Sequence, residues 1–199
     1  MPSPAPVSYA ECDLERPETF ASAVAEAAEA LGGFDTAVVT AGLFATQAKL
    51  ESDREFTQRL LTVNFAHTVL FCEHVRAYLL AQGGGTLCVF SSVAGDRGRK
   101  PVILYGATKA GLSTYLEGLD HKFRSAGLRT ICVKPGFVRT AMTEGLPEPP
   151  FAADPDQVAS TVVRAIDRGT PVVYAPPIWA LVMLVIRLLP RAVMRRVGF

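Results

Sequence analysis

Tyr105 and Lys109 stand four positions apart in a segment that is predicted to be helical. At this spacing the two side chains lie on one helix face, one turn apart. A phenol normally loses its proton at about pH 10, but a neighbouring ammonium favours the phenolate and lowers that pKa. The pair is therefore predicted to act as a general acid or base near neutral pH. The alternative is a half-buried tyrosine beside a solvated lysine, because this spacing is a weak signal when taken alone.

Hydroxyl and amide side chains in two other segments can join this chemistry. Ser91 and Ser92 follow an apolar strand predicted at 86–90, and active sites of open α/β sheets lie at the carboxyl edge of such strands. The Ser92 hydroxyl can then hydrogen-bond a substrate carbonyl that Tyr105 protonates; the alternative is that both serines only cap a loop. Asn64 lies within a largely apolar predicted helix, where a buried amide needs a partner. A local hydrogen bond at a helix kink is the alternative for Asn64.

Strands and helices are predicted to alternate along the chain. Strands are expected at 7–14, 35–40, 86–90, 128–133 and 171–175. Helices are expected at 17–31, from a capping box of Ser52 and Glu55 to about residue 80, at 102–125 and at 154–168. Apolar strands that alternate with helices of this length predict the α/β class, with a parallel sheet built from βαβ units.

Length and composition restrict the class of protein. The 199 residues are 49% hydrophobic and 20% charged, which predicts one folded domain with a large core and excludes a disordered chain. The net charge of +1 gives no reason to expect a nucleic-acid partner. There is no secretory signal, and no C-x-x-C pair that would indicate a metal site, so we expect a cytoplasmic protein with reduced thiols. Its four cysteines are Cys12, Cys72, Cys88 and Cys132.

The C-terminal segment is apolar and basic. Ile178–Ile186 is an unbroken apolar run, shorter than the roughly 20 residues that a membrane-spanning helix needs. Three arginines then recur at every fourth position and share one helical face, unless Pro190 kinks the helix. They are Arg187, Arg191 and Arg195. A basic face beside an apolar face with Trp179 predicts peripheral contact of 178–199 with the inner face of a membrane. The alternative is a terminal helix that packs on its own domain or on a dimer partner.

Six segments, taken in order, resemble the short-chain dehydrogenase/reductase family. They are Cys12-Asp13-Leu14, Thr40-Ala41-Gly42, Val63-Asn64, Ser91-Ser-Val-Ala-Gly95, Tyr105-Gly-Ala-Thr-Lys109 and Lys134-Pro-Gly-Phe-Val-Arg-Thr140. The resemblance implies a Rossmann-like, doubly wound parallel sheet in a partial dinucleotide-binding domain at 1–176, followed by a basic amphipathic tail at 177–199. It also implies an NAD- or NADP-dependent oxidoreductase, in a homo-oligomer, that interconverts a small-molecule or lipid-linked ketone and a secondary alcohol.

The resemblance implies a role for each matching residue. Tyr105 would be the acid or base, Ser92 would bind the carbonyl, and Lys109 would activate Tyr105 and bind the nicotinamide ribose. Asn64 would hold a water molecule that links Lys109 to solvent, and Asp13 would meet the adenine. Besides Asn64, Tyr105 and Lys109, the remaining cofactor contacts would be Ala41, Gly42, Pro135, Gly136, Val138 and Thr140.

The chain departs from the family pattern in two places. Thr40 stands where the family usually has an asparagine, so a sheet-stabilising amide is replaced by a hydroxyl. The family's glycine-rich turn, T-G-x-x-x-G-x-G, binds the cofactor pyrophosphate and does not occur in this sequence. The fold is therefore expected to lack the first βαβ segment, with an unpaired edge at 35–40 and weakened cofactor binding. Three hypotheses follow: a truncated or mis-started active oxidoreductase, an inactive homologue that binds no cofactor, or a membrane- or partner-binding module.

A narrower resemblance concerns the substrate. The segments 95–100, 105–112 and 135–146 are similar to decaprenylphosphoryl-2-keto-erythro-pentose reductases. This resemblance implies a sugar ketone linked to a polyprenyl phosphate. Arg97, Arg99 and Lys100 could then meet the phosphate, and the alternative is that they belong to a solvated loop.

Overall fold

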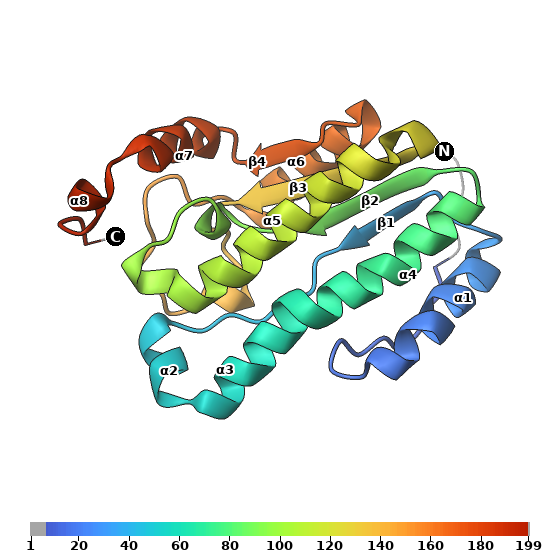
Figure 1. Cartoon of the computed structure of the whole chain (residues 1–199), viewed down its shortest axis with the longest axis horizontal. Coiled ribbons are helices and arrows are strands. Elements are labelled where there is room, and N and C mark those ends of the chain that lie inside the picture. The colour runs from blue at the N-terminus through green and yellow to red at the C-terminus, as the bar shows by residue number, and fades with distance from the viewer. Residues whose placement is uncertain (1–6, 199) are drawn as a thin grey trace.

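Four short apolar segments pair into a parallel sheet in the order β1-β2-β3-β4 (Figure 1). The strands are β1 (Thr36–Val39), β2 (Gly85–Phe90), β3 (Leu128–Pro135) and β4 (Val172–Ala175). The sheet comes from a computed structural model that describes residues 7–198. The predicted α/β class with a parallel, Rossmann-like sheet is therefore confirmed.

Helices cover both faces of this sheet. The α-helices are α1 (Phe20–Leu31), α2 (Gln47–Ser52), α3 (Arg54–Leu61), α4 (Thr68–Ala81), α5 (Ile103–Phe123), α6 (Pro155–Arg168), α7 (Ile178–Leu188) and α8 (Arg191–Met194). A π-helical turn at Thr62–His67 joins α3 to α4. Short 3-10 turns lie at Pro17–Thr19, Val93–Gly95, Lys100–Val102, Arg124–Ala126 and Ala141–Thr143.

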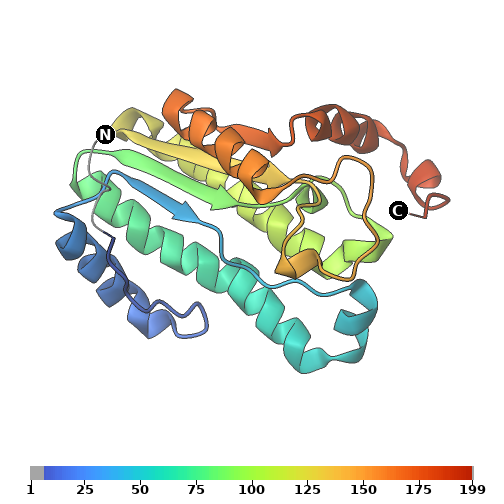
Figure 2. The same cartoon turned by 180° about the vertical axis from the view of Figure 1, so that it is seen from behind.

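Alternating side chains of the strands explain the two layers. Along β2, Leu87 and Val89 pack with α1, α4 and α5, whereas Cys88 packs with α6 on the opposite face. Figure 1 shows α4 and α5 in front of the sheet, and Figure 2 shows α6 from the other side. Because both faces of β2 are covered, the strand is apolar throughout, as parallel strands usually are.

The strand predicted at 7–14 is wrong. Residues 7–13 are irregular and lead into a turn. A strand needs a neighbour that completes its backbone hydrogen bonds, and this segment lies against a helix instead. The carbonyl oxygen of Leu14 accepts a hydrogen bond from Nδ1 of His67 (2.6 Å), and Glu15 pairs with Arg59.

The capping box predicted at Ser52 and Glu55 is also wrong. Asp53 caps α3, with its Oδ1 accepting the backbone N–H of Phe56 at 2.9 Å. Ser52 instead ends α2, a short helix that the periodicity did not predict. Asp53 has extended backbone angles (φ −124°, ψ 92°), so the chain breaks there and the two helices stay separate. Aspartate and serine are about equally good N-caps, which is why the pattern alone could not separate them.

The tail forms two helices in place of one amphipathic helix. α7 ends at Leu188 and Pro190 precedes α8, so the arginines do not share one continuous face. Met183 and Ile186 are buried in a cluster with Val93 of the domain. The inner face of α7 therefore packs on its own domain, as the alternative predicted. Within residues 7–198, no helix combines the length and the apolar character that crossing a membrane requires.

Candidate active site

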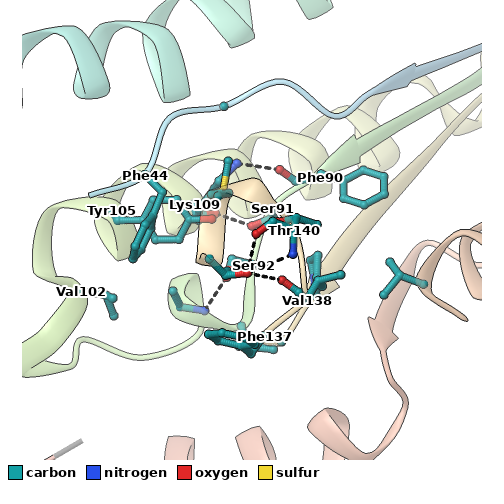
Figure 3. Close-up of a pocket in the computed structure, with 18 of the residues that line it drawn as sticks. Phe44, Phe90, Ser91, Ser92, Val102, Tyr105, Lys109, Phe137, Val138 and Thr140 are labelled. Carbon is teal, nitrogen blue, oxygen red and sulfur yellow. Dashed lines mark hydrogen bonds between the residues drawn. The ribbon is translucent and has the colours of Figure 1, made fainter. Parts of the chain in front are cut away.

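A cavity of about 620 Å³ lies at the carboxyl ends of the strands (Figure 3). Its walls come from the segments that follow β1, β2 and β3, from the start of α5, and from α7. The carboxyl edge of a parallel sheet is where ligands bind in open α/β folds. The cavity therefore lies where the sequence placed Ser92 and Tyr105, and both residues line it.

Close backbone packing brings Ser92 to the helix that carries Tyr105. Ser92 caps the turn Val93–Gly95, and its Oγ accepts the backbone N–H of Ala94 at 3.1 Å. A Cβ added at Gly95 would lie 2.7 Å from the backbone of Lys109, and one at Gly106 would lie 2.7 Å from the carbonyl oxygen of Ala94. Only glycine permits these two approaches. The serine is therefore held in place by the backbone of α5.

Tyr105 is enclosed by aromatic and polar neighbours. Its ring meets the ring of Phe44 edge to face, with centroids 5.1 Å apart (Figure 3). Burial raises the pKa of the Tyr105 phenol, and a hydrogen bond with Ser92 lowers it to a smaller extent. The predicted fall in the pKa is therefore wrong for this structure, because burial outweighs the hydrogen bond with Ser92. A phenol with a raised pKa is protonated at neutral pH and can donate a proton.

Lys109 is almost fully buried, with 4% of its surface exposed. Its Nζ donates a hydrogen bond to the carbonyl oxygen of Phe90 at 2.8 Å and lies 5.7 Å from the centroid of the Tyr105 ring (Figure 3). Burial lowers the pKa of Lys109 to about 8. The alternative of a solvated lysine beside a tyrosine is therefore wrong.

Asn64 lies behind the cavity and fixes the segment that follows β1. Its Oδ1 accepts the backbone N–H of Leu43 at 2.6 Å, and its Nδ2 donates to the carbonyl oxygen of Leu43 at 2.7 Å. The partner is thus a distant loop, and the kink alternative is wrong, although the residue does lie in a π-helical turn. Such turns are frequent at functional sites. A Cβ added at Gly42 would lie 3.4 Å from Oδ1 of Asn64 and 3.5 Å from Nζ of Lys109, so the glycine adjoins both groups.

Replacing Asn64 by alanine is expected to lower the free energy of unfolding by about 3 kcal/mol. The change leaves both backbone groups of Leu43 without their partner, and each buried unpaired group costs about 1–3 kcal/mol. Urea denaturation measures this loss. As a control, Gln58→Ala on the exposed face of α3 should change the stability by less than about 0.5 kcal/mol. Equal stability of the two variants would show that the Asn64 contacts contribute nothing.

The structure gathers most of the predicted site residues in one place. Those that line the cavity are Gly42, Ser92, Tyr105, Lys109, Pro135, Gly136, Val138 and Thr140. Ala41 precedes Gly42 and does not line it. Asp13 also lies outside the lining; its carboxylate accepts the backbone N–H of Glu15 at 2.8 Å and pairs with Arg16. The structure therefore supplies no contact between Asp13 and the cavity.

Sequence reasoning missed the aromatic walls of the cavity. Phe44, Phe137 and Trp179 all line it. Trp179 was predicted to face a membrane, but it turns inward, where its ring meets that of Phe151 edge to face with centroids 6.4 Å apart. A Cβ at Gly136 would overlap the indole nitrogen, so the glycine makes room for the tryptophan. The only sequence signal was that these aromatic residues stand just after predicted strands.

The three basic side chains of the loop after β2 do not converge on the cavity. Two of them form hydrogen bonds with the tail. Arg97 donates to the carbonyl oxygen of Leu189 at 2.8 Å, and Lys100 donates to that of Arg195 at 3.1 Å. These two side chains hold the tail against the loop. Arg99 alone lines the cavity, and its burial lowers the pKa of its guanidinium.

Comparison with known proteins gives the chain a family context. The family described as short chain dehydrogenase matches residues 4–150. An uncharacterized oxidoreductase of Mycobacterium tuberculosis is 38% identical over 83% of this chain, which spans 66% of that relative, slightly less than two thirds. Carbonyl reductase family member 4 of Xenopus tropicalis is 29% identical over 78% of this chain and 70% of its own length. A short chain dehydrogenase from Burkholderia cenocepacia, solved in complex with NADP, superposes with a TM-score of 0.79 over 94% of this chain and 76% of that chain. At 22% identity, this likeness shows the fold alone.

Proposed function

The chain belongs to the short chain dehydrogenase family, and on that basis we propose that its cavity interconverts a ketone and a secondary alcohol with NAD or NADP. The observation that carries the proposal is that Ser92, Tyr105 and Lys109 line one cavity at the carboxyl edge of the sheet. A hydroxyl can hydrogen-bond the carbonyl oxygen, a protonated phenol can give that oxygen a proton during reduction, and a buried ammonium can stabilise the phenolate that results.

The described residues fit the nicotinamide half of the cofactor. Lys109 offers a buried ammonium for ribose hydroxyls, and Gly42 adds no side chain to the cavity wall beside it. When bound, the nicotinamide would supply the hydride for reduction or accept it in the reverse reaction.

The chain's own residues then handle the carbonyl oxygen and the proton. Ser92 would donate a hydrogen bond to that oxygen and orient the carbonyl toward Tyr105. The Tyr105 hydroxyl would give its proton to the same oxygen as negative charge develops there. Lys109 would favour the resulting phenolate through its positive charge. Asn64 would act indirectly, by holding the wall that contains Leu43.

We also propose that the ketone is attached to an apolar group such as a polyprenyl phosphate. The narrower resemblance of three segments supports this, and so do the mostly apolar walls of the cavity. α7 forms part of these walls through Trp179, and its outer face is apolar: Leu181, Leu184 and Leu188 are 60%, 54% and 75% exposed. We propose that 177–199 contacts an anionic membrane through this face and the nearby exposed arginines.

Flotation with vesicles tests the membrane proposal. The protein is expected to float with vesicles that contain anionic lipid at low salt, and Leu184→Glu should leave it in the soluble fraction because the charge would have to enter the interface. Val163→Glu is the matched control, since Val163 is 56% exposed on α6, away from the tail. Wild-type protein that stays soluble at low salt contradicts the proposal. Sedimentation without vesicles shows whether a second copy of the chain covers this face, as the expected homo-oligomer would allow.

A further inference from the structure

Asp96 has a buried carboxylate to which the proposed reaction assigns no role. It follows the turn Val93–Gly95 that Ser92 caps (the Ser92 turn), and its side chain is 3% exposed. Its Oδ1 accepts a hydrogen bond from Nζ of Lys134 at 2.6 Å, and its Oδ2 accepts one from the hydroxyl of Tyr174 at 2.7 Å. Buried charges are retained where they are paired and hydrogen-bonded, and here both carboxylate oxygens have a partner.

The two partners of Asp96 stand side by side on the sheet. Lys134 on β3 is opposite Tyr174 on β4 in the parallel register, and Nζ of Lys134 lies 5.6 Å from the centroid of the Tyr174 ring. Burial and, to a smaller extent, the hydrogen bond with Asp96 raise the pKa of Tyr174 to about 12. The hydroxyl therefore keeps its proton at neutral pH and donates the hydrogen bond. Both partners are the last but one residue of their strands, so Asp96 binds the sheet at its carboxyl edge.

Each of these three residues adjoins a different part of the cavity wall. Segment 92–94 of the wall lies just before Asp96 in the chain, and segment 135–138 begins directly after Lys134. Tyr174 lies on β4 shortly before α7, which supplies a third part of the wall. The two hydrogen bonds of Asp96 therefore join wall segments that are far apart in the sequence.

These bonds complement the contacts on the other side of the Ser92 turn. The close approach of Gly95 to the backbone of Lys109 fixes the turn against α5, whereas Asp96 fixes it against β3 and β4. In the proposed reaction Ser92 holds the carbonyl, and the nicotinamide would lie against the segment that begins at Pro135. The position of one reactant relative to the other therefore depends on the link through Asp96.

We propose that Asp96 is a positioning residue, which fixes the Ser92 turn relative to the carboxyl ends of β3 and β4 through Lys134 and Tyr174. The proposal rests on the proposed function for the reaction that is positioned, whereas the link itself can be tested without substrate or cofactor. Misplacement of reacting groups by about 1 Å can cost about 10²-fold in rate. We expect the link to affect kcat more than KM, because the substrate still binds when the reacting groups are misaligned.

Steady-state kinetics on the whole chain tests the effect on the reaction, with the ketone that the wild type reduces fastest in a screened panel. Asp96→Ala should lower kcat by about 10²-fold and change KM by less than about threefold. Tyr174→Phe removes one of the two hydrogen bonds and should cause a smaller loss. The double variant should be no slower than Asp96→Ala, because the Tyr174 hydroxyl acts through the carboxylate, whereas losses at independent sites would multiply.

Amide hydrogen exchange, followed by mass spectrometry, tests the link without a reaction. The backbone N–H groups of Ala94 and Gly95 both donate to Ser92, to its Oγ at 3.1 Å and to its carbonyl oxygen at 3.0 Å, so their exchange reports on opening of the turn. Both amides should exchange at least about tenfold faster in Asp96→Ala, and Tyr174→Phe should show a smaller increase.

Glu73→Ala is the matched control for both measurements. The Glu73 carboxylate also binds one cation and one tyrosine hydroxyl, those of Arg76 at 2.7 Å and Tyr115 at 2.6 Å, but Glu73 does not line the cavity. This variant should keep the wild-type kcat and the wild-type exchange in the Ser92 turn. If Asp96→Ala does not fold, Tyr174→Phe serves in its place, because it keeps the ring and leaves the ion pair intact.

Three results would overturn the positioning role. The first is unchanged exchange in the Ser92 turn of both Asp96→Ala and Tyr174→Phe. The second is undiminished kcat in Asp96→Ala, or a double variant whose loss is the product of the two single losses. The third is an equal fall of kcat in Glu73→Ala, which would indicate a general loss of stability. A wild type that reduces no ketone and binds neither NADH nor NADPH would reject the proposed function, and the exchange rates alone would then decide whether Asp96 fixes the turn.

Discussion

Tyr105→Phe is expected to lower kcat by about 10³-fold while leaving the affinity for NADH or NADPH nearly unchanged. The change removes only the hydroxyl that gives the proton, and positioned general acids contribute about 10²–10⁴-fold. The ring remains, so its edge-to-face contact with Phe44 at 5.1 Å is preserved and the cavity keeps its shape. The measurement is the rate of cofactor oxidation with the ketone that the wild type reduces fastest in a screened panel.

Tyr115→Phe is the matched control for this variant. Tyr115 lies on the same helix, but its hydroxyl donates to Glu73 at 2.6 Å and it does not line the cavity. It should therefore retain the wild-type rate, with at most a loss of stability. A Tyr105→Phe protein with undiminished kcat would remove Tyr105 from its assigned role. A rate that falls equally in both variants would indicate a general disturbance of α5.

Lys109→Met is expected to abolish activity and yet to stabilise the protein at pH 7. Burial lowers the pKa of Lys109 from 10.5 to about 8. Each pKa unit corresponds to about 1.4 kcal/mol, so the buried charge opposes folding by about 3 kcal/mol below pH 8. The substitution also removes the hydrogen bond to Phe90, and this loss lowers the free energy of unfolding by about 1 kcal/mol. A net gain of about 2 kcal/mol in the free energy of unfolding should remain.

The pH dependence of this gain has a definite sign. Between about pH 8 and pH 10.5 the folded state has lost the Lys109 proton and the unfolded state still holds it. Stability of the wild type therefore rises with pH across this range, and the advantage of Lys109→Met shrinks. Urea denaturation at pH 7 and pH 10 measures both effects. Lys122→Met, an exposed position on the same helix, should show no such trend. Lower stability of Lys109→Met than of the wild type at pH 7 would contradict the buried charge.

The sequence was informative wherever chemistry depends on local spacing. The four-residue spacing of Tyr105 and Lys109, the apolar strand before Ser91, and Asp154-Pro155 at the start of α6 all predicted features that the structure has. These signals are local because helix and strand periods are set by near neighbours. The parallel sheet followed from the alternation of elements.

Features that depend on distant contacts could not be predicted. Nothing near Asn64 indicates that its partner is Leu43, twenty-one positions earlier. The inward turn of Trp179, which lies on α7, depends on the space that Gly136 leaves just after β3. The pKa of Lys109 depends on how deeply the folded chain buries it, and burial reversed the expected direction for Tyr105. A strand is predicted at 7–14, but strand formation requires a pairing partner that no local pattern guarantees.

Trp179 provides the most direct measurement of whether the cavity binds a nicotinamide. It is the single tryptophan of the chain and it lines the cavity, so its emission reports on what binds there. Reduced nicotinamide absorbs where tryptophan emits, and free tryptophan at the same cofactor concentration corrects for absorbed light. We predict saturable quenching of Trp179 by NADH or NADPH, with half-saturation below about 1 mM, the upper end of common KM values. A folded protein whose emission neither cofactor quenches saturably at that concentration would contradict the proposed nicotinamide site.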